Sequence, residues 1–131
     1  MKDFSAFTIS LEQAKEWTGK WRKQNPKQSK GFLMPIEDLL GCLIEMGIIK
    51  VDSDGNGTVT YKENEKVRTY LGVDTKGEEK LMMVGTKNDD GTYVDIIRDE
   101  TKEEKAPGDS GIYDLSEPCP PNCDPNSPIN P

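Results

Sequence analysis

Residues 52–63 constrain the chain more than any other stretch, because they match the twelve-residue calcium loop of an EF-hand at each defining position. Asp52, Asp54 and Asn56 stand at loop positions 1, 3 and 5, and Glu63 stands at position 12. At position 7 the expected ligand is the main-chain carbonyl of Thr58. The sequence therefore predicts that Asp52, Asp54, Asn56, Thr58 and Glu63 hold one Ca²⁺ ion.

The residues on either side of this loop favour a different structure. Gly47 interrupts the helix that would enter an EF-hand loop, and Ile48 to Val51 is typical of a strand. The Asp/Gly-rich stretch between them is then typical of the turn of a β-hairpin that pairs Ile48–Val51 with Thr58–Tyr61. No second complete loop accompanies the first, although EF-hands usually work in pairs. Both interpretations stay open, since a strand-flanked loop can still wrap a cation.

Composition narrows the classes of function. The chain has 131 residues, a hydrophobic fraction of 33% and a mean hydropathy of -0.75, which favours one domain with a small core and a tail. Its net charge of -7 argues against nucleic-acid binding through phosphates and suits cations or a protein partner with a basic surface. The absence of histidine removes the commonest general base, so we expect a protein that is not an enzyme.

The beginning of the chain bears on its location. Met1 to Ser5 lacks the apolar run of a signal peptide, and no stretch is apolar for long enough to span a membrane. We therefore expect a cytoplasmic protein that does not bind membranes.

Two helices are expected in the first part of the chain. Ser10 and Gln13 form a capping-box pattern, and the helix that follows should fade near Asn25 and Pro26. Its apolar stripe is expected to pack in the core, and comprises Leu11, Ala14, Trp17 and Trp21.

A second helix is expected between Pro35 and Gly47. Its buried stripe should comprise Ile36, Leu39, Leu40, Leu43 and Ile44. Cys42 lies beside this stripe and is expected to be a buried, inert thiol.

The second half of the chain changes to strand periodicity. Val67–Val73, Lys80–Val84 and Thr92–Ile97 are expected strands joined by short Asp/Gly turns, so they should be antiparallel neighbours. The sequence predicts an α+β fold in which two N-terminal helices pack on a small antiparallel β-meander, with an irregular Pro-rich tail.

Three ranges follow from this pattern. Residues 1–97 are expected to form the α+β domain with the EF-hand-like loop 52–63 inserted, and residues 98–111 a charged loop or linker. Residues 112–131 should be a Pro/Cys tail docked on the domain. Within it, Cys119 and Cys123 are expected to form a local disulfide or remain two free thiols, with a zinc site that adds Cys42 and Asp124 as a third alternative.

Four segments carry a resemblance to a known group of proteins. They are Glu12–Trp17, Met34–Leu39, Tyr70–Asp74 with Leu81–Gly85, and Pro118–Asp124 near Ser127 and Pro128. Together they resemble an uncharacterised bacterial family of small proteins, and the closing Cys-Pro-Pro motif is the most specific of them. The resemblance implies no activity, and residues 52–63 look like an addition to the family pattern.

These observations lead to two hypotheses about function. The first is an acidic, non-enzymatic binding protein with one Ca²⁺ site. The alternative is a protein–protein interaction module of the inhibitor or immunity type, in which the loop is only a hairpin turn.

Overall fold

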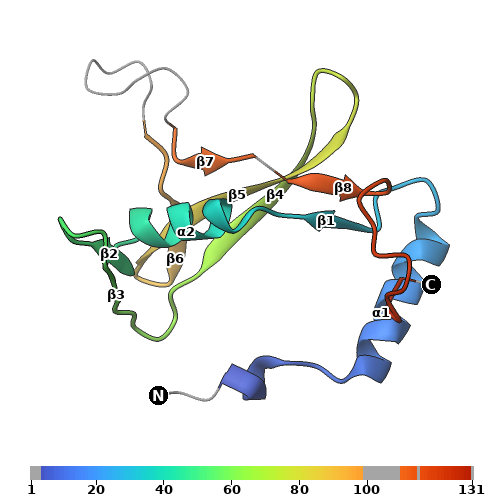
Figure 1. Cartoon of the computed structure of the whole chain (residues 1–131), viewed down its shortest axis with the longest axis horizontal. Helices are drawn as coiled ribbons and strands as arrows, with labels where there is room; N and C mark the ends of the chain where they lie inside the picture. Colours follow the sequence, from blue (N-terminus) through green and yellow to red (C-terminus); the bar gives the residue numbers. More distant parts are fainter. Residues whose placement is uncertain (1–3, 99–109, 115, 131) are drawn as a thin grey trace. The chain divides into compact units, whose positions relative to one another are not determined.

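The computed structural model describes residues 4–98, 110–114 and 116–130 of a mixed α+β protein (Figure 1). Its elements are, in order, the 3₁₀-helix η1 (Phe4–Phe7), α1 (Leu11–Gln24), β1 (Gly31–Leu33), α2 (Ile36–Glu45), β2 (Ile49–Val51), β3 (Gly57–Val59), β4 (Val67–Val73), β5 (Glu79–Asp89), β6 (Thr92–Asp95), β7 (Ile112–Tyr113) and β8 (Glu117–Cys119).

Contacts group the chain into two compact units. The helix–tail unit comprises residues 1–33 and 118–131, and the sheet unit comprises residues 34–117. The boundaries of these two units differ from those of the three expected ranges, 1–97, 98–111 and 112–131. The division into those three ranges stays a prediction. Most of the expected linker, residues 99–109, lies outside the described residues.

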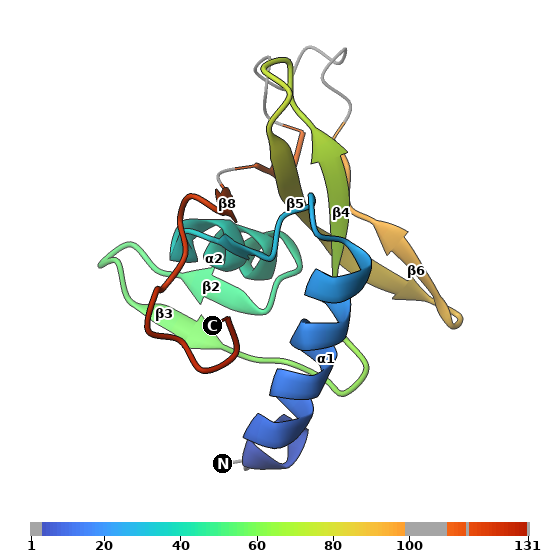
Figure 2. The ribbon, with the colours of Figure 1, turned by 90° about the vertical axis from the view of Figure 1, so that its right-hand side faces the viewer.

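The sheet unit is built around β5, as Figure 2 shows. β4 pairs with it antiparallel from Val67 opposite Gly85 to Val73 opposite Glu79, and β6 pairs with its second half. Met83 and Val84 pair with β7 as well as with β4, so β7 lies across β5 from β4. The predicted antiparallel strands are confirmed, and β5 is longer than expected because its second half pairs with β6.

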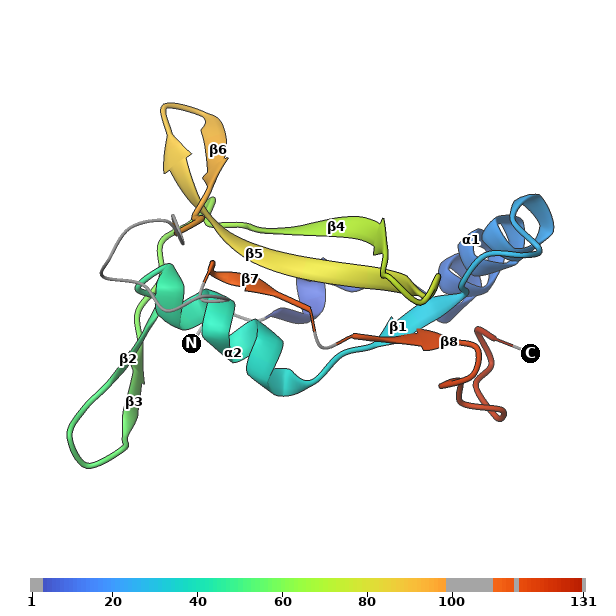
Figure 3. The same ribbon diagram turned by 90° about the horizontal axis from the view of Figure 1, so that it is seen from above.

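Helix α2 packs against β5 and β7 (Figure 3), at a distance set by two glycines. A Cβ atom on Gly85 would lie 2.7 Å from Met46 Cγ and 3.2 Å from the Cys42 carbonyl oxygen. A Cβ atom on Gly41 would lie 2.4 Å from Cζ of Tyr113. The helix therefore rests almost directly on the backbone of β5, and the tyrosine ring of β7 fills the space beside Gly41.

This contact decides which face of α2 is buried, and the expected stripe was wrong. Asp38 and Cys42 are both 0% exposed, whereas Ile36, Leu40 and Ile44 are 59%, 40% and 47% exposed. Because Gly41 and its neighbour Cys42 must face the sheet, the row of larger apolar side chains is rotated away from it.

The first helix forms as expected but does not bury its tryptophans. Ser10 Oγ accepts a hydrogen bond from Gln13 N at 3.1 Å, and Ser10 N donates to Gln13 Oε1 at 3.3 Å, which confirms the capping box. No residue of α1 is buried, and Trp17 is 54% exposed, so the predicted core stripe is wrong. Within its unit, α1 instead uses the side chain of Arg22 to hold the C-terminal segment. The expected packing of both helices on the meander is not confirmed.

Replacing the helix glycine in each unit tests the close contact. Ala in place of a mid-helix Gly normally stabilises by about 0.5–1 kcal/mol, and we expect this gain for Gly19→Ala, where the nearest atom to a new Cβ is 3.8 Å away. Gly41→Ala should instead destabilise by about 1–3 kcal/mol, because the new methyl group overlaps the Tyr113 ring. Denaturant unfolding measures both, and Tyr113→Leu should reduce the cost of Gly41→Ala. Equal stabilisation by the two alanines would contradict the contact.

Candidate functional site

The predicted calcium loop lies in a β-hairpin. β2 and β3 pair antiparallel with Ile49 opposite Val59 and Val51 opposite Gly57, and Thr60 N donates to the Ile48 carbonyl at 2.8 Å. Asp52 N donates to the Asn56 carbonyl at 2.9 Å and closes the turn. The structure thus adopts the hairpin alternative, with strands close to those expected.

The Asp52 carboxylate is held by the backbone of this turn. Its Oδ1 atom accepts hydrogen bonds from the amides of Asp54 and Asn56, each at 2.9 Å. Gly55 completes the turn with a φ of 84°, a left-handed conformation that glycine adopts without steric cost.

A second turn in the sheet unit repeats this arrangement bond for bond. Between β4 and β5, Asp74 N donates to the Glu78 carbonyl at 2.9 Å, and Gly77 has a φ of 83°. Asp74 Oδ1 accepts from the amides of Lys76 and Glu78, again at 2.9 Å. The Asp74 turn lacks the later positions of a calcium loop. The pattern Asp-x-x-Gly-x therefore closes both hairpins by its own hydrogen bonds.

The remaining predicted ligands are spread over other places. Thr58 lies within β3 opposite Lys50, and Glu63 follows the hairpin and lines a separate cavity together with Glu45 and Glu65. Within residues 4–98, 110–114 and 116–130, no three Asp, Glu, Cys or His side chains lie together as a metal site. The structure thus brings Asp52, Asp54 and Asn56 into one turn and does not group Glu63 with them. Calcium binding stays a prediction.

The Asp74 turn makes stability depend on acid pH. The hydrogen bond from Glu78 N, followed by that from Lys76 N, lowers the pKa of the Asp74 carboxyl. A lowered folded-state pKa gives stability that is present above the unfolded value of about 3.9 and is lost as pH falls through the folded value. Asp74→Asn keeps the Oδ1 acceptor, so we expect a flatter loss of stability below about pH 4. Unfolding curves at several pH values measure it, and an unchanged acid slope would contradict the carboxylate's role.

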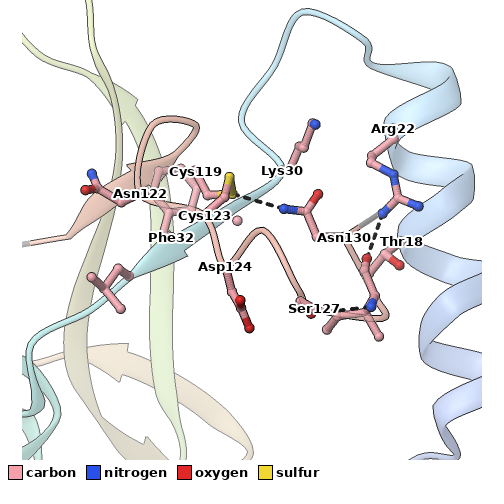
Figure 4. A pocket seen from close by; sticks show the side chains of 13 residues that line it. Thr18, Arg22, Lys30, Phe32, Cys119, Asn122, Cys123, Asp124, Ser127 and Asn130 are labelled. Carbon is pink, nitrogen blue, oxygen red and sulfur yellow. Dashed lines mark hydrogen bonds between the residues drawn. A yellow bond between two sulfur atoms is a disulfide. The ribbon is translucent and has the colours of Figure 1, made fainter.

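The helix–tail unit contains a cavity of about 220 Å³ (Figure 4). Thr18 and Arg22 of α1 line one wall, and Lys30 with β1 lines another. The C-terminal segment supplies the rest, including Cys119, Cys123, Asp124, Ser127, Ile129 and Asn130.

Hydrogen bonds and one disulfide fix the walls of this cavity. Lys30 N donates to the Cys119 carbonyl at 2.6 Å, and Arg22 Nη1 donates to the Ile129 carbonyl at 2.7 Å. Cys119 and Cys123 form a disulfide, and the Asn130 Nδ2 amide donates to Cys119 Sγ at 3.5 Å. Of the alternatives for the two cysteines, the structure adopts the local disulfide, which removes both thiolates from any zinc site.

The third cysteine is the inert thiol that the sequence predicts. Cys42 is fully buried and unpaired. Burial, with a smaller contribution from the charge of Asp38, raises its pKa to about 11. The thiol is therefore protonated near neutral pH and is a poor nucleophile.

One polar cluster crosses the sheet but satisfies itself. Arg68 of β4 forms an ion pair with Asp95 of β6, and the Tyr70 hydroxyl donates to the other oxygen of Asp95. These hydrogen bonds to Asp95 raise the pKa values of Arg68 and Tyr70. Because every member is partnered within the sheet, the cluster links strands and presents no free catalytic group.

The two units carry opposite charge. The sheet unit contains 20 Asp/Glu and ten Lys/Arg residues, a net charge of −10, whereas the helix–tail unit contains four Asp/Glu and seven Lys/Arg residues, a net charge of +3. Together they give the net charge of -7 for the chain. The whole-chain value conceals a basic unit. The sequence analysis missed the cavity residues Arg22, Lys30 and Asn130, because no sequence motif identifies them. The excess of Lys and Arg in residues 1–33 is the sequence signal that indicates a basic site in this unit.

Comparison with protein families, with curated proteins and with solved structures finds no match. The resemblance to a bacterial family of small proteins therefore stays a prediction. Among the described residues, no helix is long and apolar enough to cross a membrane.

Proposed function

We propose that the chain is a non-enzymatic binding protein whose sheet unit docks a protein partner with a basic surface. The observation that carries this proposal is the exposure of the apolar row on α2. Ile36, Leu40 and Ile44 are spaced four residues apart and form one row along the helix, and all three are at least 40% exposed. An exposed row of large apolar side chains is typical of a surface that another protein covers.

Charge supports the choice of partner. The sheet unit has a net charge of −10, and Glu37 lies exposed on α2 next to the row. Such a field attracts a basic surface over distances of about 10 Å at moderate salt and disfavours an acidic one. The fitting partner therefore has an apolar patch rimmed by Lys and Arg, and it should associate more slowly as salt rises.

The chemistry of the described residues supports a binding role over a catalytic one. The chain has no histidine, Cys42 is buried with a raised pKa, and Asp95 is held by Arg68 and Tyr70. The commonest general base is thus absent, the Cys42 thiol is protonated, and Asp95 is already engaged. The cytoplasmic location stays a prediction. The Cys119–Cys123 disulfide does not favour it, because disulfides persist mainly in oxidising compartments.

Two measurements test the docking surface. Ile36→Ser should change the free energy of unfolding by no more than about 0.5 kcal/mol, because the side chain is exposed. A photoreactive side chain at position 40 should cross-link to basic proteins of the native host, whereas one at the exposed Thr92 should not.

Either of two results would contradict the proposal. A cost of about 2 kcal/mol or more for Ile36→Ser would mean that the chain itself covers the row. Equal cross-linking at positions 40 and 92 would mean that the row is not a specific surface.

Calcium binding by residues 52–63 is the second candidate function. The favouring observation is that Asp52, Asp54 and Asn56 occupy one exposed turn, while Glu63 would have to approach them on binding. Few carboxylates and an unpaired loop imply an affinity of roughly 10⁻⁵ to 10⁻³ M.

Calorimetry with CaCl₂ tests this candidate. We expect heat of binding for the wild type and a weaker signal for Glu63→Gln, because the substitution removes the bidentate ligand at position 12. Glu65→Gln makes the same charge change two residues away and should bind as the wild type does. Flat titrations for all three proteins would exclude the site.

A further inference from the structure

We propose that the cavity of the helix–tail unit binds a small ligand with a carboxylate on an apolar body, the chemistry shared by the C-terminal residue of a peptide and by a free aliphatic acid. Arg22 and Lys30 would hold the carboxylate. The site is separate from the α2 row and does not rest on the proposed docking function.

The cations on the cavity wall have hydrogen-bonding capacity left over. Arg22 uses one of its five N–H donors on the Ile129 carbonyl, and the other donors form a planar fork that matches a carboxylate. Lys30 lines the same cavity, and its ammonium group makes no ion pair or hydrogen bond with the described residues. The surrounding unit has a net charge of +3 and so favours an anion.

The rest of the lining favours an apolar body of limited size. Phe32, Leu33 and Ile129 contribute apolar surface beside the two cations. A volume of about 220 Å³ is below the range of roughly 300–1,000 Å³ that holds drug-sized ligands. One amino-acid residue or a short aliphatic acid fits this space, and a longer chain would have to extend out of it.

The lining also discriminates between anions. Asp124 lies in the wall, where its Oδ1 atom accepts a hydrogen bond from Asn126 N at 3.0 Å. A fixed negative charge repels a phosphate dianion more strongly than a monovalent carboxylate. The lining therefore carries two cations and one carboxylate, a net charge of +1 that a single ligand carboxylate neutralises.

The walls are held in place before any ligand arrives. The hydrogen bonds of Arg22 and Lys30 tie α1 and the start of β1 to the C-terminal segment. The disulfide and the Asn130 hydrogen bond hold that segment together within itself. The Oδ1 atom of Asn130 is shielded from solvent and accepts no hydrogen bond from the described residues. After a small shift of the Asn130 side chain, this oxygen would accept a hydrogen bond from an N–H group that the ligand carries next to its carboxylate.

Titration of the full-length ¹⁵N-labelled protein with four probes tests the site. The probes are N-acetyl-leucine, 4-methylpentanoate, N-acetyl-leucinamide and inorganic phosphate. We expect saturable shifts of the Lys30–Leu33 amides and of the Asn130 side-chain amide with both carboxylates. Tighter binding of N-acetyl-leucine would identify a peptide C-terminus as the ligand, and equal binding would identify a free acid. The neutral amide should bind at least about tenfold more weakly, since a charge-assisted hydrogen bond is lost.

Matched variants separate the site from general charge. Lys30→Gln should weaken carboxylate binding about tenfold, whereas Lys27→Gln makes the same charge change outside the lining and should have less than about a twofold effect. Arg22→Lys keeps the charge, loses the fork and should also weaken binding. The proposal would be overturned if N-acetyl-leucine and N-acetyl-leucinamide bound equally well, or if phosphate bound more tightly than the carboxylates. It would also be overturned if Lys27→Gln and Lys30→Gln had equal effects, or if no probe shifted the amide signals.

Discussion

The sheet unit depends on the close approach of α2 to β5 and β7. This packing is sterically possible only because positions 41 and 85 are glycines without a side chain. A methyl group at either glycine would overlap Tyr113 or Met46. This contact fixes the rotation of α2 about its axis, so Asp38 and Cys42 are buried and the apolar row turns outward. The proposed docking surface is thus a consequence of how the helix meets the sheet.

Local hydrogen bonds account for the conformation of residues 52–56, the first part of the calcium-loop motif. The Asp52 and Asp74 turns use donors and acceptors at equivalent positions, and each has a left-handed glycine at its fourth position. Only the Asp52 turn continues with the later positions of an EF-hand loop. The Asp at the first position of such a loop is also the acceptor that both turns use, whereas positions 3 and 5 contribute only their backbone amides. A complete match to a metal motif can therefore arise partly from the needs of a hairpin.

The predictions that succeeded depend on neighbours in the sequence. The capping box of Ser10 and Gln13 and the strand Val67–Val73 depend on residues close together in the sequence, and both are confirmed. The alternating burial expected for this strand is not, because Leu71 and Val73 are 73% and 69% exposed. The buried face of α2 was predicted wrongly, because the contact of Gly41 with Tyr113 joins segments that are far apart in the chain. The cavity was missed for the same reason, since Arg22 meets the carbonyl of Ile129 across most of the sequence.

Residues 52–56 fold through their own hydrogen bonds, and NMR of the whole chain in calcium-free buffer tests whether this turn needs metal. If the hairpin forms without metal, nuclear Overhauser contacts between Lys50 and Thr58 and between Ile49 and Val59 will be present in EDTA. The amides of Asp54 and Asn56 will then be protected from exchange by the Asp52 carboxylate. Contacts and protection that appear only after calcium is added would contradict it and would show that the metal organises the loop.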